Sequence, residues 1–102
     1  MSIFSIFGAN KTNEKVSDFL QKGALIIDVR TPDEYRSGHI TQSVNIPLNL
    51  LPGKVNELKR KNKAVITCCR SGARSGMAAD VLNKAGVETV NGGPWNSLES
   101  MM

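Results

Sequence analysis

The hydrophobic pattern of the chain switches repeatedly between two kinds of segment. Some segments are short apolar runs rich in β-branched residues, as is typical of strands, and others carry apolar residues at helical spacing. The predicted strands are residues 24–29, 43–46, 64–67 and 88–90. The longer predicted helices are residues 13–22, residues 54–61 and the segment from Met77 to Ala85. Because strands and helices alternate, we expect an α/β domain with a mainly parallel central sheet and helices on both faces.

Residues typical of helix starts and helix ends lie at the boundaries of several predicted elements. Thr31-Pro32-Asp33-Glu34 has the pattern of a helix start, with Thr31 as N-cap, Pro32 as first helical residue and Glu34 able to bond back to the cap. Gly38 keeps this helix short. Gly23 and Gly86 each follow a helical segment, where glycine commonly ends a helix, and Pro52-Gly53 predicts a turn.

The length of 102 residues suits one small domain. We expect residues 12–102 to form it, with residues 1–11 as an N-terminal segment that is packed or partly flexible. Within that segment Ile3, Phe4, Ile6 and Phe7 could form an edge strand or pack across one face. No apolar stretch approaches the roughly 20 residues of a membrane span, and the N-terminus lacks the basic lead of a secretory signal. We therefore expect no membrane association.

The net charge of +4 is mild, and its largest local source is the run at residues 59–61 with Lys63. This run reads as a solvated helix end, because cations suit a helix C-terminus. It has no interleaved aromatic residues, so we expect no nucleic-acid partner.

The two cysteines, Cys68 and Cys69, are adjacent in the sequence. Neighbouring Cα atoms lie about 3.8 Å apart, which is too close for an ordinary disulfide. One histidine and no second cysteine pair give too few ligands for zinc. We therefore expect no metal and no cofactor, and we expect a reducing, cytoplasmic setting in which free thiols persist.

The stretch from Thr67 to Ser75 is where strand, polar loop and helix follow one another directly. Free backbone N–H groups at a helix start favour negative charge, so this arrangement predicts an anion site that would also ionise a thiol. Five residues lie between Cys68 and Arg74, which is the spacing found in phosphatases whose loop wraps a tetrahedral oxyanion. Counted from Cys69, only four intervene and Gly72 falls three residues on, so the loop would close around something smaller, such as one sulfur atom. The spacing of Gly72 and Arg74 therefore favours Cys69 over Cys68 as the nucleophile.

Several segments together resemble a known family. The relevant motifs are residues 25–35, 38–40 and 43–48, the loop of residues 69–75 and the closing segment of residues 92–95. In this order they resemble a single-domain rhodanese, the thiosulfate sulfurtransferase family, over roughly residues 12–98. Cys68 departs from the pattern, because many relatives carry a bulkier residue there.

The resemblance implies that Cys69 is a catalytic thiolate. It would take a sulfane sulfur from thiosulfate or a similar anion and pass it, as a persulfide, to cyanide, a thiol or a protein cysteine. The implied substrate-binding residues are the rest of the loop: Arg70, Ser71, Gly72, Ala73, Arg74 and Ser75. In this interpretation both arginines contact the charged donor and the loop N–H groups stabilise the sulfur.

Two alternatives remain open at this level. One is a phosphatase or arsenate reductase of the same fold that uses Cys68, and the other is a non-catalytic rhodanese-like module that carries or binds sulfur. Among the remaining polar and aromatic residues, we expect Cys68 to be a small buried side chain. Asp28 and Arg30 are expected to brace the loop or to pair with neighbouring charges. His39 is predicted to hydrogen-bond at a turn, and Trp95 to pack over the core.

Overall fold

The computed structural model describes residues 7–102, with side chains from residue 12 onward. These residues form five α-helices, four β-strands and one 3-10 helix. In chain order they are α1 (Phe7–Gln21), β1 (Leu25–Asp28), α2 (Pro32–Arg36), β2 (Val44–Asn45), the 3-10 helix η1 (Leu48–Lys54), α3 (Val55–Lys61), β3 (Val65–Cys69), α4 (Ala73–Lys84), β4 (Thr89–Pro94) and α5 (Trp95–Glu99).

The four strands form one parallel sheet in the order β2-β1-β3-β4. β3 is central, pairing Ile66 with Ile26 of β1 on one side and with Val90 of β4 on the other. Because all four strands run in the same direction, their carboxyl ends meet at one edge of the sheet. The predicted α/β architecture is confirmed, and the loop after β3 lies at this edge.

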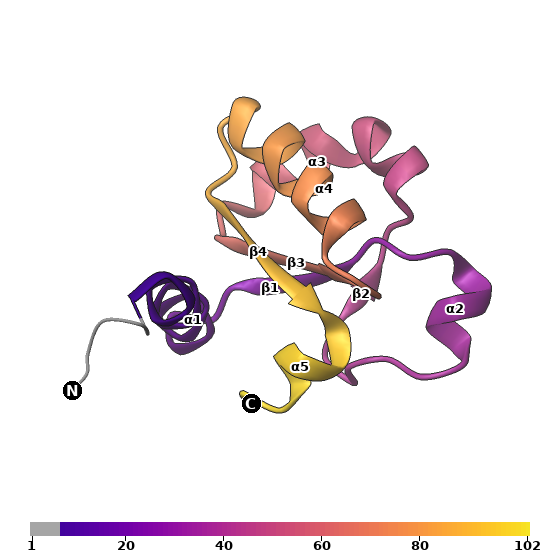
Figure 1. The fold of residues 1–102 in the computed structure, drawn as a ribbon. Helices are drawn as coiled ribbons and strands as arrows, with labels where there is room; N and C mark the ends of the chain where they lie inside the picture. Colours follow the sequence, from indigo (N-terminus) through magenta and orange to yellow (C-terminus); the bar gives the residue numbers. More distant parts are fainter. Residues whose placement is uncertain (1–6) are drawn as a thin grey trace.

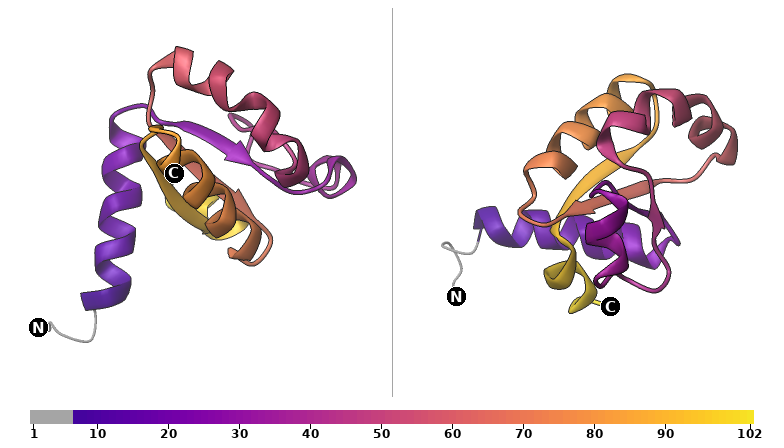
Figure 2. Two further views of the ribbon diagram at one scale, coloured as in Figure 1. Left: turned by 90° about the horizontal axis from the view of Figure 1, so that it is seen from above. Right: turned by 90° about the vertical axis from the view of Figure 1, so that its right-hand side faces the viewer.

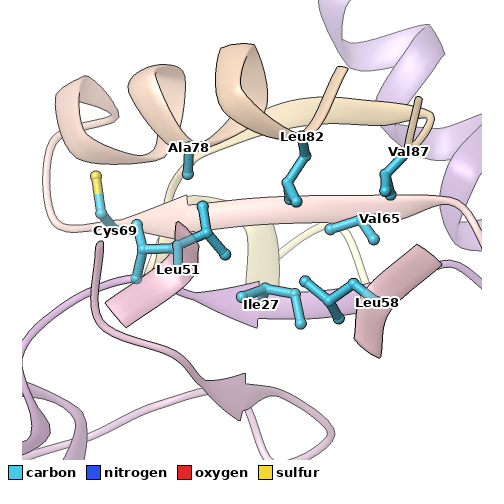
Figure 3. Packing of buried hydrophobic residues seen from close by; sticks show 9 residues of the cluster. Ile27, Leu51, Leu58, Val65, Cys69, Ala78, Leu82 and Val87 are labelled. Atoms are coloured by element: carbon cyan, nitrogen blue, oxygen red, sulfur yellow. The ribbon is translucent and has the colours of Figure 1, made fainter. Parts of the chain in front are cut away.

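Helices cover both faces of the sheet, with α3 and α4 on one side and α1 and α5 on the other (Figures 1 and 2). Each face has its own buried cluster. The cluster under α3 and α4, drawn in Figure 3, consists of Ile27, Val29, Leu51, Leu58, Val65, Cys69, Ala78, Leu82 and Val87. The cluster beside α1 and α5 consists of Val16, Phe19, Ile26, Ile40, Ile66, Cys68, Val90 and Leu98. Successive residues of a strand point to opposite faces, which is why Cys68 and Cys69 fall in different clusters.

The first helix differs from its predicted bounds. α1 begins at Phe7 rather than residue 13 and so crosses the expected boundary between residues 11 and 12. Val16 and Phe19, which carry the apolar spacing, are buried, and the residues before them contain no proline, so the helical backbone extends back to Phe7. Phe7 lies in α1, and the strand or packing role predicted for the residues before it lies outside the described residues.

Two further segments were not predicted as helices. The turn expected at Pro52-Gly53 lies inside η1, and the 54–61 helix is shortened to α3 because η1 occupies its first residue. The closing segment forms the five-residue α5, which buries Leu98. A helix this short presents less than two turns, so its apolar spacing cannot be distinguished from that of a loop.

Candidate active site

Cys69 is the last residue of β3, and its side chain lies on the α4 face of the sheet (Figure 3). The residue exposes 0% of its surface. The chain turns from β3 into α4 within three residues, and Gly72 makes this possible with a φ of +100°, a region that disfavours side-chain-bearing residues. The short turn folds the start of α4 back over the sulfur.

The hydrogen bonds around the Cys69 sulfur come from this turn. The Gly72 N–H donates to Sγ at 3.0 Å and the Ser75 N–H at 3.4 Å, while the Ser75 hydroxyl lies 3.3 Å from the sulfur. Burial by itself raises the pKa of the Cys69 thiol, but the hydrogen bonds from Ser75, Gly72 and Ser71 outweigh it and hold the pKa below its ordinary value. The loop therefore favours the thiolate.

Cys68 has the opposite surroundings. Its side chain lies on the other face of the sheet, among the residues that pack under α1 and α5, and it exposes 0% of its surface. Burial raises the pKa of Cys68 to about 12, with the nearby Asp28 carboxylate as the next cause. The prediction of a small buried side chain is confirmed, and the backbone N–H groups of the loop point to the neighbouring Cys69 instead.

The two arginines of the loop have different environments. Arg74 forms a two-pronged ion pair with Glu34, with nitrogen–oxygen distances of 2.8 and 3.0 Å. This pair lowers the pKa of Glu34 to about 2 and raises that of Arg74. Arg70 is exposed and has no hydrogen-bonding or ion-pair partner among the residues that the structure describes. Direct contact of both arginines with substrate stays a prediction, but only Arg70 is free of a protein partner.

Arg70 lines a hollow of about 390 Å³ beside the loop. The other residues around this hollow are Arg30, Glu34, Ser37, Trp95 and Asn96. Arg30 is neutralised by Asp28 and Glu34 by Arg74, so Arg70 supplies the unbalanced positive charge of the wall. The hollow therefore suits an anion.

Asp28 and Arg30 form a buried ion pair with each other, so the predicted pairing with a neighbouring charge is confirmed, whereas bracing of the loop stays a prediction. The Arg30 guanidinium donates to both carboxylate oxygens, at distances from 2.7 to 3.1 Å, and also to the carbonyl of Gly38. Its face packs on the Trp95 ring at 4.9 Å from the ring centre. Trp95 is half-buried against the cluster beside α1 and α5, as expected, and this packing joins α5 to the segment after β1.

Two further predicted positions, Ala73 and His39, form hydrogen bonds with neighbouring residues of the chain. Ala73 begins α4, and its N–H donates to the Ser71 hydroxyl at 3.4 Å. His39 bonds through Nδ1 to the carbonyl of Tyr35 and stacks on the Tyr35 ring, which confirms its hydrogen-bonding role.

Asn91 on β4 is a site residue that the sequence did not reveal. Its side chain bonds to both Ser75 and the Gly72 carbonyl, so it holds the start and the end of the turn together. Asn91 is only half-buried and belongs to no motif that carries chemistry, and it reaches the loop because β4 pairs with β3. Glu34 was predicted only as part of the helix cap, and its link to Arg74 spans 40 residues.

Two absences concern only residues 7–102. No cluster of three or more His, Cys, Asp or Glu side chains there is arranged to hold a metal ion. None of the helices in that range combines the length and apolar character needed to cross a membrane.

The fold and the loop together define an α/β domain that holds one cysteine sulfur among backbone N–H groups at the carboxyl edge of a parallel sheet. The chain matches the Rhodanese-like domain family over residues 12–93 and belongs to that family.

Three known proteins illustrate the relationship. The thiosulfate sulfurtransferase PspE of Escherichia coli is 34% identical over 61 residues, which cover 59% of this chain and 59% of that protein. The putative sulfur carrier protein YrkF of Bacillus subtilis is 42% identical over 65 residues, covering 64% of this chain and 35% of that one. The crystal structure of a rhodanese-related protein from Thermoplasma volcanium is 31% identical, with a TM-score of 0.71, covering 84% of this chain and 88% of that chain. Among three further curated relatives, the matches span 49% to 62% of the relative's length.

Proposed function

We propose that this domain is a sulfurtransferase that carries sulfane sulfur as a persulfide on Cys69, with thiosulfate or a similar anion as donor. The observation that carries the proposal is the pair of backbone N–H groups, from Gly72 and Ser75, aimed at the Cys69 sulfur. Fixed donors of this kind stabilise negative charge on sulfur in both the thiolate and the persulfide. The relationship to a thiosulfate sulfurtransferase supports the same chemistry.

The first half-reaction loads the cysteine. The Cys69 thiolate attacks the outer sulfur of thiosulfate and forms a new sulfur–sulfur bond, while the bond between the two thiosulfate sulfurs breaks and its electron pair leaves with sulfite. No general base is needed because the thiolate is already present. Arg70 would bind the sulfonate-like oxygens of the donor from the neighbouring hollow.

The second half-reaction unloads the sulfur. Cyanide or an acceptor thiolate attacks the outer sulfur of the persulfide, and the electron pair of the breaking bond restores the Cys69 thiolate. The product is thiocyanate or an acceptor persulfide, so no electrons are gained or lost overall. This exchange suits a reducing compartment such as the cytoplasm, where acceptor thiols stay reduced.

A matched pair of cysteine variants tests the proposal. Cys69→Ser should abolish sulfur transfer from thiosulfate to cyanide, whereas Cys68→Ser should keep most of it, because Cys68 lies on the other face of the sheet. Thiocyanate formation is the readout. Activity that survives in Cys69→Ser and disappears in Cys68→Ser would overturn the assignment and favour the alternative of a phosphatase or arsenate reductase, which hydrolysis of an aryl phosphate would then test.

A second candidate function is a sulfur-carrier module that is loaded by a protein partner. The similarity to a putative sulfur carrier protein supports this second candidate. Negligible turnover with thiosulfate, together with rapid loading of Cys69 by a cysteine desulfurase, would identify this role. Both candidates use the same persulfide and differ in its source.

A further inference from the structure

The side-chain amide of Asn91 is held in one orientation by two backbone groups. Its Nδ2 donates to the Gly72 carbonyl at 3.1 Å, and its Oδ1 accepts from the Gly93 N–H at 2.9 Å. A carbonyl can only accept and a backbone N–H can only donate, so exchanging the amide oxygen and nitrogen would break both bonds. Oδ1 is therefore the atom that faces Ser75.

Ser75 has one hydroxyl proton and two neighbours that can take it. Its Oγ lies 2.7 Å from Asn91 Oδ1 and 3.3 Å from Cys69 Sγ, and the residue exposes 0% of its surface. The Asn91 oxygen has no proton of its own, so the 2.7 Å contact requires the hydroxyl to donate to it. A thiolate at Cys69 is also an acceptor, and it requires the same proton.

We propose that Asn91 is a positioning residue that competes with the Cys69 sulfur for the single hydroxyl proton of Ser75. The inference deepens the proposed function and relies on it only in treating the Cys69 sulfur as the reacting atom.

The competition gives the site two arrangements. While Cys69 is a neutral thiol, its S–H donates to the Ser75 oxygen and the Ser75 hydroxyl donates to Asn91. When Cys69 becomes a thiolate, rotation about the Ser75 Cβ–Oγ bond moves the hydroxyl proton toward the sulfur, and Asn91 Oδ1 keeps only the Gly93 N–H. Forming the thiolate thus costs one hydrogen bond to Asn91, and removing that acceptor should make ionisation easier.

The other charged and titratable groups near the sulfur stay constant in this comparison. They are Cys68 on β3, Arg70 in the turn, Arg74 on α4, and Asp28 with Arg30 at the end of β1. The β4 segment that faces the loop, residues 89–94, contains no titratable side chain. A change at Asn91 therefore reports on the Ser75 proton.

The test measures ionisation of Cys69 in Asn91→Leu, which removes the acceptor at similar size. Thiolate absorbance in the ultraviolet is followed against pH, and the curve of the matching Cys69→Ser protein is subtracted in each case. We expect the midpoint to move to lower pH by about one unit, a tenfold rise in the thiolate-to-thiol ratio near neutral pH. A role limited to holding the loop predicts the opposite sign, because a loosened turn would weaken the Gly72 N–H bond to the sulfur.

Two further variants keep the test decisive. Asn91→Ala removes the same acceptor without adding a branched side chain, and it should shift the midpoint in the same direction if Asn91→Leu fails to fold. In a Ser75→Ala background neither change at Asn91 should lower the midpoint, because the shared proton is gone. An unchanged or higher midpoint in the single variants, or a lowering that persists without the Ser75 hydroxyl, would overturn the proposal.

The readout is separate from sulfur transfer. If Cys69 accepts no sulfur from any donor, the proposed function fails while the titration still reports on Asn91. If sulfur transfer is normal and the midpoint does not move, the proposed function stands and the competition for the Ser75 proton is refuted.

Discussion

Arg70 illustrates how the environment of a single side chain separates it from a sequence neighbour of the same type. Arg70 and Arg74 are equivalent candidates in the sequence, but Glu34 occupies the Arg74 guanidinium while Arg70 lines the hollow beside the loop. Charge-assisted hydrogen bonds to an anion contribute about 1.5–3 kcal/mol. Arg70 is therefore the loop arginine expected to bind a charged donor.

We expect Arg70→Ala to lower kcat/KM for thiosulfate by about ten- to hundredfold. This is the rate ratio that corresponds to losing a charge-assisted hydrogen bond of about 1.5–3 kcal/mol. Steady-state kinetics with thiosulfate as the varied substrate provides the measurement. Lys61→Ala, which removes an exposed charge at the end of α3, is the matched control. Equal effects of the two changes would show that only the overall charge of the domain matters.

The sequence predicted part of the residue-level picture and missed the rest for a physical reason. The spacing of Gly72 and Arg74 from Cys69 is local, because one tight turn joins the strand and the helix, so the register could be inferred from sequence. Asn91 and Glu34 reach the loop from 16 or more residues away. Such contacts follow from strand pairing and helix placement, which no single-sequence spacing encodes.

Among the elements, the start of α2 is the one that neighbouring residues in the sequence predict most clearly. The Thr31 hydroxyl accepts from the Glu34 N–H at 3.3 Å, and the Glu34 carboxylate accepts from the Thr31 N–H at 3.0 Å, which confirms the predicted cap. The same carboxylate also binds Arg74 of α4. A cap that would ordinarily serve one short helix therefore also supports the loop.

Removing the cap should destabilise the domain. We expect Thr31→Ala to lower the free energy of unfolding by about 1 kcal/mol, the usual cost of losing an N-cap side chain. Denaturant titration monitored by Trp95 fluorescence measures it. Thr41→Ala, which changes an exposed threonine outside every helix, should cost less, and equal losses would contradict a capping role.

The elements that were wrongly bounded or missed share a lack of periodic apolar positions. α1 begins at Phe7, before its predicted start at residue 13, η1 replaces a predicted turn, and α5 buries one leucine. The two central strands, β1 and β3, were found because both faces of the sheet are covered there, which leaves continuous apolar runs.

At the scale of the whole molecule, the Glu34–Arg74 pair connects two parts of the chain that share no backbone hydrogen bonds, α2 beyond the sheet edge and α4 on its face (Figure 1). The pKa of Glu34 is lowered to about 2 from an ordinary value of 4.5, chiefly by hydrogen bonds from Arg74. A lowered pKa means that the ionised group stabilises the folded state above pH 4.5 and that this contribution is lost as the pH falls toward 2.

We expect Glu34→Gln to flatten the acid limb of the stability curve in this window. The free energy of unfolding of the wild-type domain should fall more steeply between pH 4.5 and 2 than that of the variant. Denaturant titrations at several pH values compare the slopes, with Glu99→Gln, an exposed carboxylate in α5, as control. Parallel curves for wild type and Glu34→Gln would show that the pair does not couple folding to pH.

The overall architecture was predictable because alternating strands and helices leave few arrangements for 102 residues. What the structure adds is the separation of the two adjacent thiols. Cys68 faces the cluster under α1 and α5, and Cys69 faces the turn that leads into α4. The proposed chemistry depends on this one-residue alternation across the sheet.

The most direct test of that claim is the intact mass of the protein after treatment with thiosulfate and removal of excess donor. Wild type and Cys68→Ser should each gain the mass of one sulfur atom, which cyanide then removes, and peptide mapping should place it on Cys69. Cys69→Ser should gain nothing. A sulfur adduct on Cys68, or no adduct on any of the three proteins with thiosulfate or with a protein donor, would contradict a persulfide carried by Cys69.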